Sequence, residues 1–330
     1  MKKQQMMMSK DDYSHDKCNE FMDKVLKKYL SFENVMVTGG SGFLGKRLQL
    51  EKPEWNYISS KDCNLTDFND VRTFINDTKP DAIVHLAGRV GGIKDNSERQ
   101  AEFYLENTLM NTNLIHAAHL AGVDRVLSSL STCAFPDTVK QYPFTEERIF
   151  DGPPAVTNFS YGYTKRTLHV QSVSYRNQYN RNYSTFAPSN IYGPGDHFNS
   201  DKSHFVPALI SKLTSAQDNT EIELWGTGSP LRQQLYVDDL VKIIPMLLEK
   251  HNNDIPIIVA PNENLSIKQM TDIALTKFKK NINIRYNNKL DGQYRKDGSN
   301  QKLIELIGQF EFTSFNKGIE NTINWYMENN

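Results

Sequence analysis

Short apolar runs alternate with helical patterns along the first two thirds of the chain. An apolar run of four to eight residues bounded by turn residues is typical of a buried strand, whereas apolar residues three and four apart indicate a helix. The strands predicted in this way are Val35–Thr38, Asn56–Ser59, Ala82–Leu86, Arg125–Ser129 and Ser184–Ala187. The helices predicted are a short one after Gly45, then Val71–Asp77, Glu98–Gly122, Tyr161–Tyr179, Val206–Leu213 and Val237–Lys250.

Strands separated by helical crossovers predict a parallel sheet with helices on both faces, an α/β fold of the Rossmann-type doubly wound class. Beyond Asn190 the chain is richer in loops, at Gly193–Asp196, Trp225–Pro230 and Leu290–Gln293. We therefore expect a cofactor-binding domain over residues 32–195. A smaller, loop-rich C-terminal domain that binds substrate follows over residues 196–330, with some segments returning to the sheet. Residues 1–31 are expected to form an extension, with a polar tail and a short amphipathic helix over Phe21–Leu30.

The overall charge offers no reason to expect a nucleic acid or a membrane as partner. The 330 residues carry 38 basic and 39 acidic side chains, which leaves 38 − 39 = −1. No signal-peptide pattern and no run of about 18 apolar residues is present, so we expect a cytoplasmic protein. Three cysteines without close spacing predict neither a metal site nor a disulfide framework.

A glycine-rich turn follows the first predicted strand and opens a helix. Its glycines have the spacing Gly-x-x-Gly-x-x-Gly, which permits a tight turn and lets the backbone approach a pyrophosphate at a helix N-terminus. We expect the cofactor to be bound by Gly39, Gly40, Ser41, Gly42, Phe43, Leu44 and Gly45, with Leu86 and Ala87 after the third strand.

The end of the second strand distinguishes the two nicotinamide cofactors. An acidic residue there would accept the ribose 2′-hydroxyl of NAD and repel a 2′-phosphate. The chain has Ser59-Ser60-Lys61 instead, before Asp62. We therefore predict NADP(H) as the cofactor, bound in part by Ser60 and Lys61.

Tyr161 and Lys165 lie four residues apart, so they share one face of the predicted helix. A tyrosine with a pKa near 10 is a poor acid or base at neutral pH, and a nearby ammonium group is expected to lower that pKa. Ser131 follows a strand and is placed to hydrogen-bond a reacting carbonyl. We predict that these three residues transfer a proton during hydride transfer, and that Lys165 also binds the nicotinamide ribose.

Cys133 and His204 suggest a second kind of chemistry. A thiol with a pKa of about 8.5 can remove a proton from carbon beside a ketone if its thiolate is stabilised. A second group must then return a proton to the opposite face of that carbon. From residue types alone, the alternatives remain that Cys133 is a small buried residue and that His204 is an ordinary loop histidine.

The glycine turn and the Tyr-x-x-x-Lys pair resemble the extended short-chain dehydrogenase/reductases. Longer segments resemble the GDP-L-fucose synthase family, especially its eukaryotic-type sequences, over about residues 33–328. These segments are Ser59–Asp62, Val90–Gly92, Ser131–Asp137, Asn190–Pro194, Trp225–Gly228, Arg232–Gln233 and Asp291–Lys296.

This resemblance implies an enzyme that converts GDP-4-keto-6-deoxy-D-mannose to GDP-L-fucose by epimerisation at C3 and C5 and reduction at C4. It implies that Cys133 and His204 are the epimerisation base and acid, and that His204 also lies at the cofactor. It further implies nicotinamide contacts from Pro188, Ser189, Asn190 and Ile191. It implies GDP-sugar contacts from Lys212, Trp225, Arg232 and Asp291. Homodimerisation through the helices around Asn107 and Tyr161 is also implied.

The chain departs from the family's usual residues at Gly88 and Arg89, at Leu231 and Gln234, and at His197.

Two other classes of function are considered: another extended short-chain enzyme that acts on nucleotide sugars, and a scaffold without catalytic activity. A 4,6-dehydratase usually has Asp-Glu after the strand-end hydroxyl, where this chain has Thr132-Cys133, and a simple 4-epimerase needs neither Cys133 nor His204. A scaffold that binds a dinucleotide without turnover would tolerate damage to Tyr161 or Lys165, which are both intact.

Overall fold

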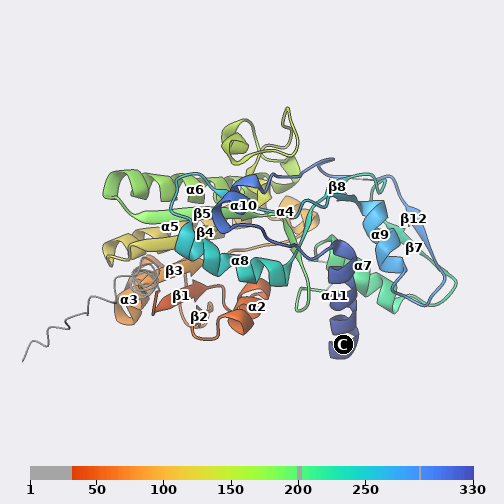
Figure 1. Ribbon diagram of the computed structural model, residues 1–330, viewed down its shortest axis with the longest axis horizontal. Coiled ribbons are helices and arrows are strands. Elements are labelled where there is room, and N and C mark those ends of the chain that lie inside the picture. The colour runs from red at the N-terminus through yellow and green to blue at the C-terminus, as the bar shows by residue number, and fades with distance from the viewer. Residues whose placement is uncertain (1–31, 199–202, 290) are drawn as a thin grey trace, which may run out of the picture. The chain divides into compact units, whose positions relative to one another are not determined.

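The computed structural model describes residues 32–198, 203–289 and 291–330. Within the compact unit of residues 34–330, a parallel sheet of six strands is flanked by helices (Figure 1). The strand order is β10-β5-β4-β3-β1-β2. The strands of this sheet are β1 (Val35–Thr38), β2 (Asn56–Ile58), β3 (Ala82–His85), β4 (Arg125–Ser129), β5 (Asn182–Pro188) and β10 (Ile257–Val259).

The sheet reverses its winding direction between β1 and β3. From β1 the chain moves outward to β2, then crosses back to β3 on the other side of β1. The helices that connect the strands from β1 to β5 are α2 (Phe43–Glu51), α3 (Phe68–Thr78), α4 (Ile93–Glu98), α5 (Gln100–Leu120) and α6 (Phe159–Tyr179). Open parallel sheets bind ligands outside the carboxyl ends of the strands at such a reversal. The residues after Thr38 and His85 therefore border the expected crevice.

Helices cover both faces of the sheet. Helices α3, α5 and α6 pack side by side, while α2 packs against α8 (Val237–Lys250), and α8 packs against α10 (Gln301–Ile307). An ion pair joins Arg47 of α2 to Asp238 at the start of α8. The doubly wound fold class predicted from the sequence is thus confirmed.

A second hydrophobic core lies among the C-terminal helices. It is built from α7 (Phe205–Ser215), α9 (Ile267–Leu275) and α11 (Phe315–Asn329) with neighbouring strands. The strands pair in three small sheets. They are β6 (Asn190–Tyr192) with β9 (Gln234–Tyr236), β7 (Thr220–Leu224) with β12 (Ile282–Tyr286), and β8 (Leu231–Arg232) with β11 (Leu265–Ser266). The chain returns to the main sheet through α8 and β10, so the C-terminal region is not contiguous in sequence.

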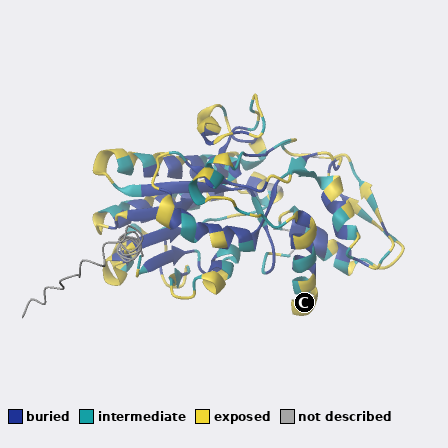
Figure 2. Ribbon diagram, viewed as in Figure 1, coloured by how far each residue is buried: buried dark blue, intermediate teal, exposed yellow. Residues whose placement is uncertain are grey.

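The burial pattern explains why the elements form where they do. Strands β1, β3 and β4 are buried along their whole length, which is why they read as apolar runs in the sequence (Figure 2). Helix α3 begins at Phe68, three residues before the prediction, because Asp67 caps the backbone N–H groups of Asn69 and Asp70. The helix predicted over Phe21–Leu30 lies outside the described residues. Across the described ranges, no helix is both long and apolar enough to cross a membrane.

Candidate active site

The glycine turn leaves the carboxyl end of β1 and packs against two neighbouring segments. Gly39 has a φ of +76°, and a side chain there would lie 2.9 Å from the backbone nitrogen of Ala87. A side chain at Gly45 would collide with the carbonyl oxygen of Gly39. Helix α2 then begins at Phe43, and its N-cap Gly42 has no side chain to occupy the first N–H groups. Those groups can therefore receive a phosphate.

A buried chain of hydrogen bonds fixes the crevice between β1 and β3. The N–H of Ala87 donates to Thr38 Oγ1 (3.2 Å), and Thr38 Oγ1 lies 2.8 Å from His85 Nδ1. His85 Nε2 lies 3.0 Å from Asn111 Oδ1, and the Asn111 amide donates to the Thr164 carbonyl (3.4 Å). Because an amide oxygen only accepts, His85 is protonated on Nε2 and accepts the Thr38 proton on Nδ1. The chain thus connects the glycine turn to α6.

The end of β2 presents hydroxyl and ammonium groups without a free carboxylate. Ser60 and Lys61 are exposed. Asp62 accepts hydrogen bonds from the Ser59 N–H (2.8 Å) and hydroxyl (2.7 Å), and these bonds lower the pKa of Asp62. The single acidic group in this loop is therefore turned back onto its own backbone.

Ser131, Tyr161 and Lys165 meet at the carboxyl end of β4. Lys165 is buried in α6 and donates to the Ser129 carbonyl (2.8 Å), and its Nζ lies 5.7 Å from the centre of the Tyr161 ring. Ser131 caps the short 3-10 helix η2 (Thr132–Ala134) by accepting from the Cys133 N–H (3.1 Å). The Ser131 side chain also hydrogen-bonds the Cys133 side chain, which contributes to lowering the pKa of Cys133.

The charge state of Tyr161 differs from the expectation. Burial, followed by the charge of Cys133, raises the pKa of Tyr161 above its usual value instead of lowering it. Burial also lowers the pKa of Lys165 to about 8. The pKa of Tyr161 is not lowered because Lys165 donates its hydrogen bond to the Ser129 carbonyl and burial removes the phenol from water. Tyr161 is therefore a neutral phenol, which is the form that can donate a proton.

Cys133 accepts hydrogen bonds from two side chains. Lys296 Nζ lies 2.9 Å and Asn158 Nδ2 3.4 Å from its sulfur. Burial alone would raise the pKa of Cys133, but the charge and hydrogen bond of Lys296, with contributions from Ser131 and Arg232, lower it. The site therefore favours a thiolate. This environment is unlike that of the small buried residue considered as an alternative.

His204 lies at the N-terminal end of α7, as its N-cap. Burial and then the positive charge of Lys296 lower its pKa, so the imidazole is neutral at neutral pH. Lys296 is thus close enough to both Cys133 and His204 for its charge to lower the pKa of each.

The cofactor residues expected from the second half of the chain follow β5. Pro188 ends β5, and Asn190 and Ile191 begin β6. The N–H of Ser189 donates to the Val259 carbonyl (3.0 Å), while its buried hydroxyl has no partner among the described residues. An unpaired buried hydroxyl is costly, so it fits a position that a ligand completes.

The residues expected to bind substrate cluster around one loop. Both carboxylate oxygens of Asp291 accept from Thr227, at 2.7 Å from its N–H and 2.8 Å from its hydroxyl, so Asp291 shapes the loop that carries Trp225. Trp225 itself is 60% exposed. Arg232 in β8 is close enough to Cys133 and Asp291 for their charges to act on its pKa, which burial lowers. Lys212 in α7 is exposed and donates to the Glu223 carbonyl (3.2 Å).

Sequence reasoning missed three contributors. Lys296 lies in the segment Asp291–Lys296, but the sequence assigns it no role, because an Arg-Lys pair in a loop cannot be distinguished from ordinary solvent-exposed charges. Asn158 and Asn111 carry no local signal, since their contacts with Cys133 and His85 join segments far apart in the chain.

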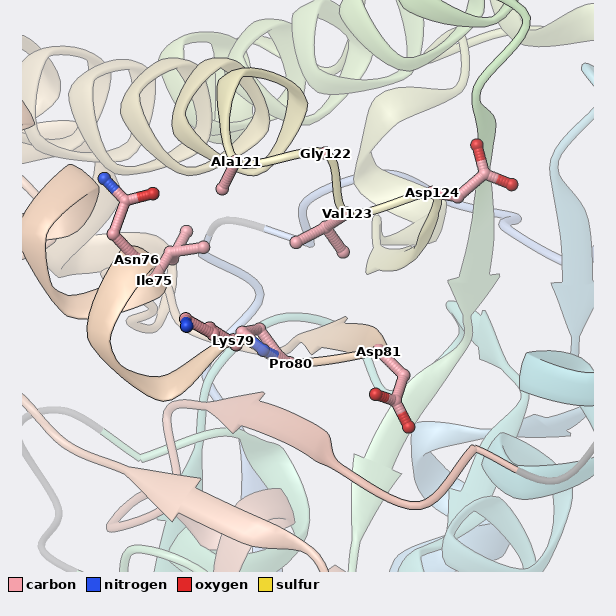
Figure 3. Close-up of a pocket in the computed structure, with 9 residues that line it drawn as sticks. All are labelled: Ile75, Asn76, Lys79, Pro80, Asp81, Ala121, Gly122, Val123 and Asp124. Carbon is pink, nitrogen blue, oxygen red and sulfur yellow. The ribbon is translucent and has the colours of Figure 1, made fainter. Parts of the chain in front are cut away.

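A hollow at the amino ends of the strands does not belong to this site. It lies where β3 and β4 begin and is lined by Ile75, Asn76, Lys79, Pro80, Asp81, Ala121, Gly122, Val123 and Asp124 (Figure 3). These nine residues include no cysteine, serine, histidine or tyrosine. The candidate active site is at the carboxyl edge, where the glycine turn and the Ser-Tyr-Lys group lie.

Comparison with known proteins agrees with this architecture. Residues 35–260 match the NAD dependent epimerase/dehydratase family. The matched range begins at β1 and ends just beyond β10, and so it includes the whole parallel sheet. The chain belongs to this family.

The individual relatives are more specific. The chain is 34% identical to a probable GDP-L-fucose synthase from Drosophila melanogaster, over 90% of this chain and 98% of that protein. It is 35% identical to a GDP-L-fucose synthase from Dictyostelium discoideum, over 91% and 97%. The structure of a GDP-L-fucose synthetase from Naegleria fowleri bound to NADP superposes with a TM-score of 0.81 at 32% identity, covering 90% of this chain and 93% of that one.

The hydrogen-bond chain at His85 predicts a stability that falls in acid. Burial and the charge of Lys165 lower the pKa of His85 to about 4. An unfolded histidine binds a proton near pH 6.5. Between about pH 6.5 and pH 4 the unfolded state therefore binds more protons, and the free energy of unfolding decreases as the pH falls. We expect the free energy of unfolding of His85→Gln to fall less steeply with acidification than that of the wild type, by up to about 1.4 kcal/mol per pH unit.

Urea unfolding of the wild type and His85→Gln at pH 7 and pH 5 tests this prediction. The exposed His197→Gln is the control and should keep the wild-type pH dependence. An identical loss of stability in wild type and His85→Gln would contradict it.

Proposed function

We propose that this protein converts GDP-4-keto-6-deoxy-D-mannose to GDP-L-fucose by C3/C5 epimerisation followed by NADPH-dependent reduction at C4, a step in GDP-fucose biosynthesis. The observation that carries the proposal is the Lys296–Cys133 contact of 2.9 Å beside the Ser131, Tyr161 and Lys165 group. A reductase alone has no use for a stabilised thiolate. The relatives that carry the name GDP-L-fucose synthase support the same conclusion.

NADP(H) fits the residues around the crevice. The turn from Gly39 to Gly45 would hold the pyrophosphate, with Leu86 and Ala87 beside it, and the exposed Ser60 and Lys61 would hold the 2′-phosphate. Asp62 Oδ2 accepts from the N–H and the hydroxyl of Ser59, so this oxygen is not free to accept a ribose 2′-hydroxyl. The unpaired Ser189 hydroxyl suits a ligand on the nicotinamide side, next to Asn190. NADPH, when bound, supplies a hydride.

Epimerisation uses Cys133 and His204. The C4 ketone acidifies the protons on C3 and C5, and the Cys133 thiolate removes one of them. The C–H electron pair becomes an enolate, whose oxygen is stabilised by the hydroxyls of Ser131 and Tyr161. His204 returns a proton to the opposite face. The negative charge of a GDP-sugar favours the imidazolium form of His204 and counteracts the effect of Lys296.

Reduction uses the same carbonyl site. The neutral phenol of Tyr161 donates its proton to the C4 oxygen, and Ser131 hydrogen-bonds that oxygen. Lys165 uses one of its three N–H donors on Ser129, which leaves two for ribose hydroxyls. One set of groups therefore serves the enolate and the alkoxide.

The GDP moiety would lie along the loop that Asp291 holds. Arg232 and Lys212 offer positive charge to the diphosphate, and the exposed ring of Trp225 offers a face for the base. The assignment of these four residues, like that of the catalytic group, rests on their positions and on the family resemblance.

We also propose a homodimer that pairs through α5 and α6. These neighbouring helices expose apolar side chains, among them Tyr104, Leu105 and Leu109 on α5 and Phe159 and Val170 on α6. Such a surface fits a second copy of the chain. Sedimentation of the purified protein as a monomer would contradict the pairing.

A cytoplasmic location is part of the proposal. Both cysteines within the described residues, Cys63 and Cys133, are free thiols, as expected of a reducing compartment. Cell fractionation that recovers the protein from secretory vesicles would contradict it.

The product identifies the reaction. We expect the purified protein, incubated with GDP-4-keto-6-deoxy-D-mannose and NADPH, to form GDP-L-fucose, identified by NMR of the sugar. A reduced but unepimerised sugar would remove the epimerase assignment and leave the reductase. Absence of NADPH consumption would contradict the proposed function as a whole.

Substitutions should separate the two reactions. Cys133→Ser is expected to lower exchange of the C3 and C5 protons with D2O by at least about 100-fold, since a hydroxyl is a far weaker base than a thiolate. NADPH binding should be unchanged, because the thiol is not part of the cofactor turn. Tyr161→Phe, which lacks the phenolic proton, should impair NADPH oxidation most.

Fluorescence titration with NADPH is the control for both variants. A loss of NADPH affinity in Cys133→Ser would argue against separate sites. Unchanged NADPH turnover in Tyr161→Phe would refute the role of the phenol.

A further inference from the structure

Lys296 is a buried ammonium group for which neither the fold nor the reduction provides an explanation. It lies between β12 and α10 and is only 8% exposed. Among residues 32–198, 203–289 and 291–330, no carboxylate forms an ion pair with it, and the neighbouring Asp297 is paired with Arg295. A buried charge requires a partner of opposite sign or strong hydrogen bonds. The contact recorded for its ammonium is the sulfur of Cys133.

The segment that carries Lys296 is fixed by backbone hydrogen bonds. The N–H of Phe144 donates to the Asp297 carbonyl (2.9 Å), and the N–H of Ser299 donates to the Phe144 carbonyl (2.8 Å). The buried side chain of Gln233 bonds both the N–H (2.9 Å) and the carbonyl (3.1 Å) of Gly298. One bond on each side of Gly298 and two at Gly298 itself leave the loop little freedom, so the backbone that carries Lys296 is held beside Cys133.

The sulfur is placed to receive donors. Besides Lys296, the Asn158 amide donates to it at 3.4 Å, and the positive charge of Arg232 lies near enough to lower the pKa of Cys133. A neutral thiol is a weak hydrogen-bond acceptor and gains little from several donors. A thiolate carries a negative charge, and each donor or positive charge near it stabilises it. The arrangement therefore matches a negative sulfur.

We propose that Lys296 is a positioning residue that keeps Cys133 in its thiolate form, ready to remove the protons at C3 and C5. This role rests on the proposed function. In the step itself one proton passes from carbon to sulfur, and the electron pair of the broken C–H bond forms the enolate. Lys296 transfers no proton. It compensates the sulfur's charge before the step and loses that role once the thiol has formed.

The pH dependence of thiol alkylation tests the proposal without any substrate. The full-length protein is treated with iodoacetamide between pH 5 and pH 10, and mass spectrometry follows each cysteine-containing peptide. We expect Cys133 to react with an inflection below that of an ordinary thiol, about 8.5. Cys63 is an internal reference in the same molecule, because burial and nearby aspartates raise its pKa to about 11.

Three variants isolate the ammonium of Lys296. Lys296→Met should move the Cys133 inflection upward by at least about one pH unit and slow alkylation at pH 7 by about tenfold. Lys296→Arg keeps the charge and should stay within a few tenths of the wild type. Arg295→Met removes the neighbouring charge, whose partner is Asp297 and not the sulfur, and should leave Cys133 unchanged.

An unchanged inflection in Lys296→Met would overturn the proposal. So would a wild-type inflection at or above 8.5, which can be measured even if Lys296→Met does not fold. A failure of the proposed function would be seen separately, in the product of the substrate incubation, because alkylation depends on no sugar.

Discussion

The hydrogen-bonded chain from Ala87 through Thr38, His85 and Asn111 to Thr164 is the constraint around which the site is arranged. It joins β1, β3, α5 and α6, which are the elements that carry the glycine turn and the Tyr-Lys pair. Thr38, His85 and Asn111 each both donate and accept, so the chain holds a single tautomer of His85. A buried network of this kind stabilises one relative position of its elements as long as every member is satisfied.

Burial determines the charge states within that crevice. Desolvation raises the pKa of Tyr161 and lowers the pKa values of Lys165 and His204, so each of these groups is shifted toward its neutral form. Cys133 is the exception, because the charge and hydrogen bond of Lys296, together with Ser131 and Arg232, outweigh the effect of desolvation on its pKa. A site that must donate a proton to one atom and remove a proton from another needs such unequal environments.

The two cores divide the tasks of the molecule. The parallel sheet with its flanking helices positions the cofactor turn and the Ser131-Tyr161-Lys165 group. The second core, with α7 and the small sheets, carries His204, Lys212, Trp225 and Arg232. Lys296 links the two, because its loop is bonded to Phe144 on one side and to Gln233 on the other.

The sequence by itself determined the alternating strands and helices, the glycine turn, and the residues Ser131, Tyr161 and Lys165. These features are local: an apolar run forms a strand, three glycines permit one turn, and residues four apart share a helix face. It also indicated a thiol with possible chemistry at Cys133. The tertiary structure decided the rest. Only the packing of distant segments shows that Tyr161 is neutral because it is desolvated. Only a contact between distant segments shows that Lys296, 163 residues beyond Cys133, supplies the charge its sulfur requires. A sequence pattern contains neither the distance between two such segments nor the dielectric between them, and these two quantities set the chemistry of the site.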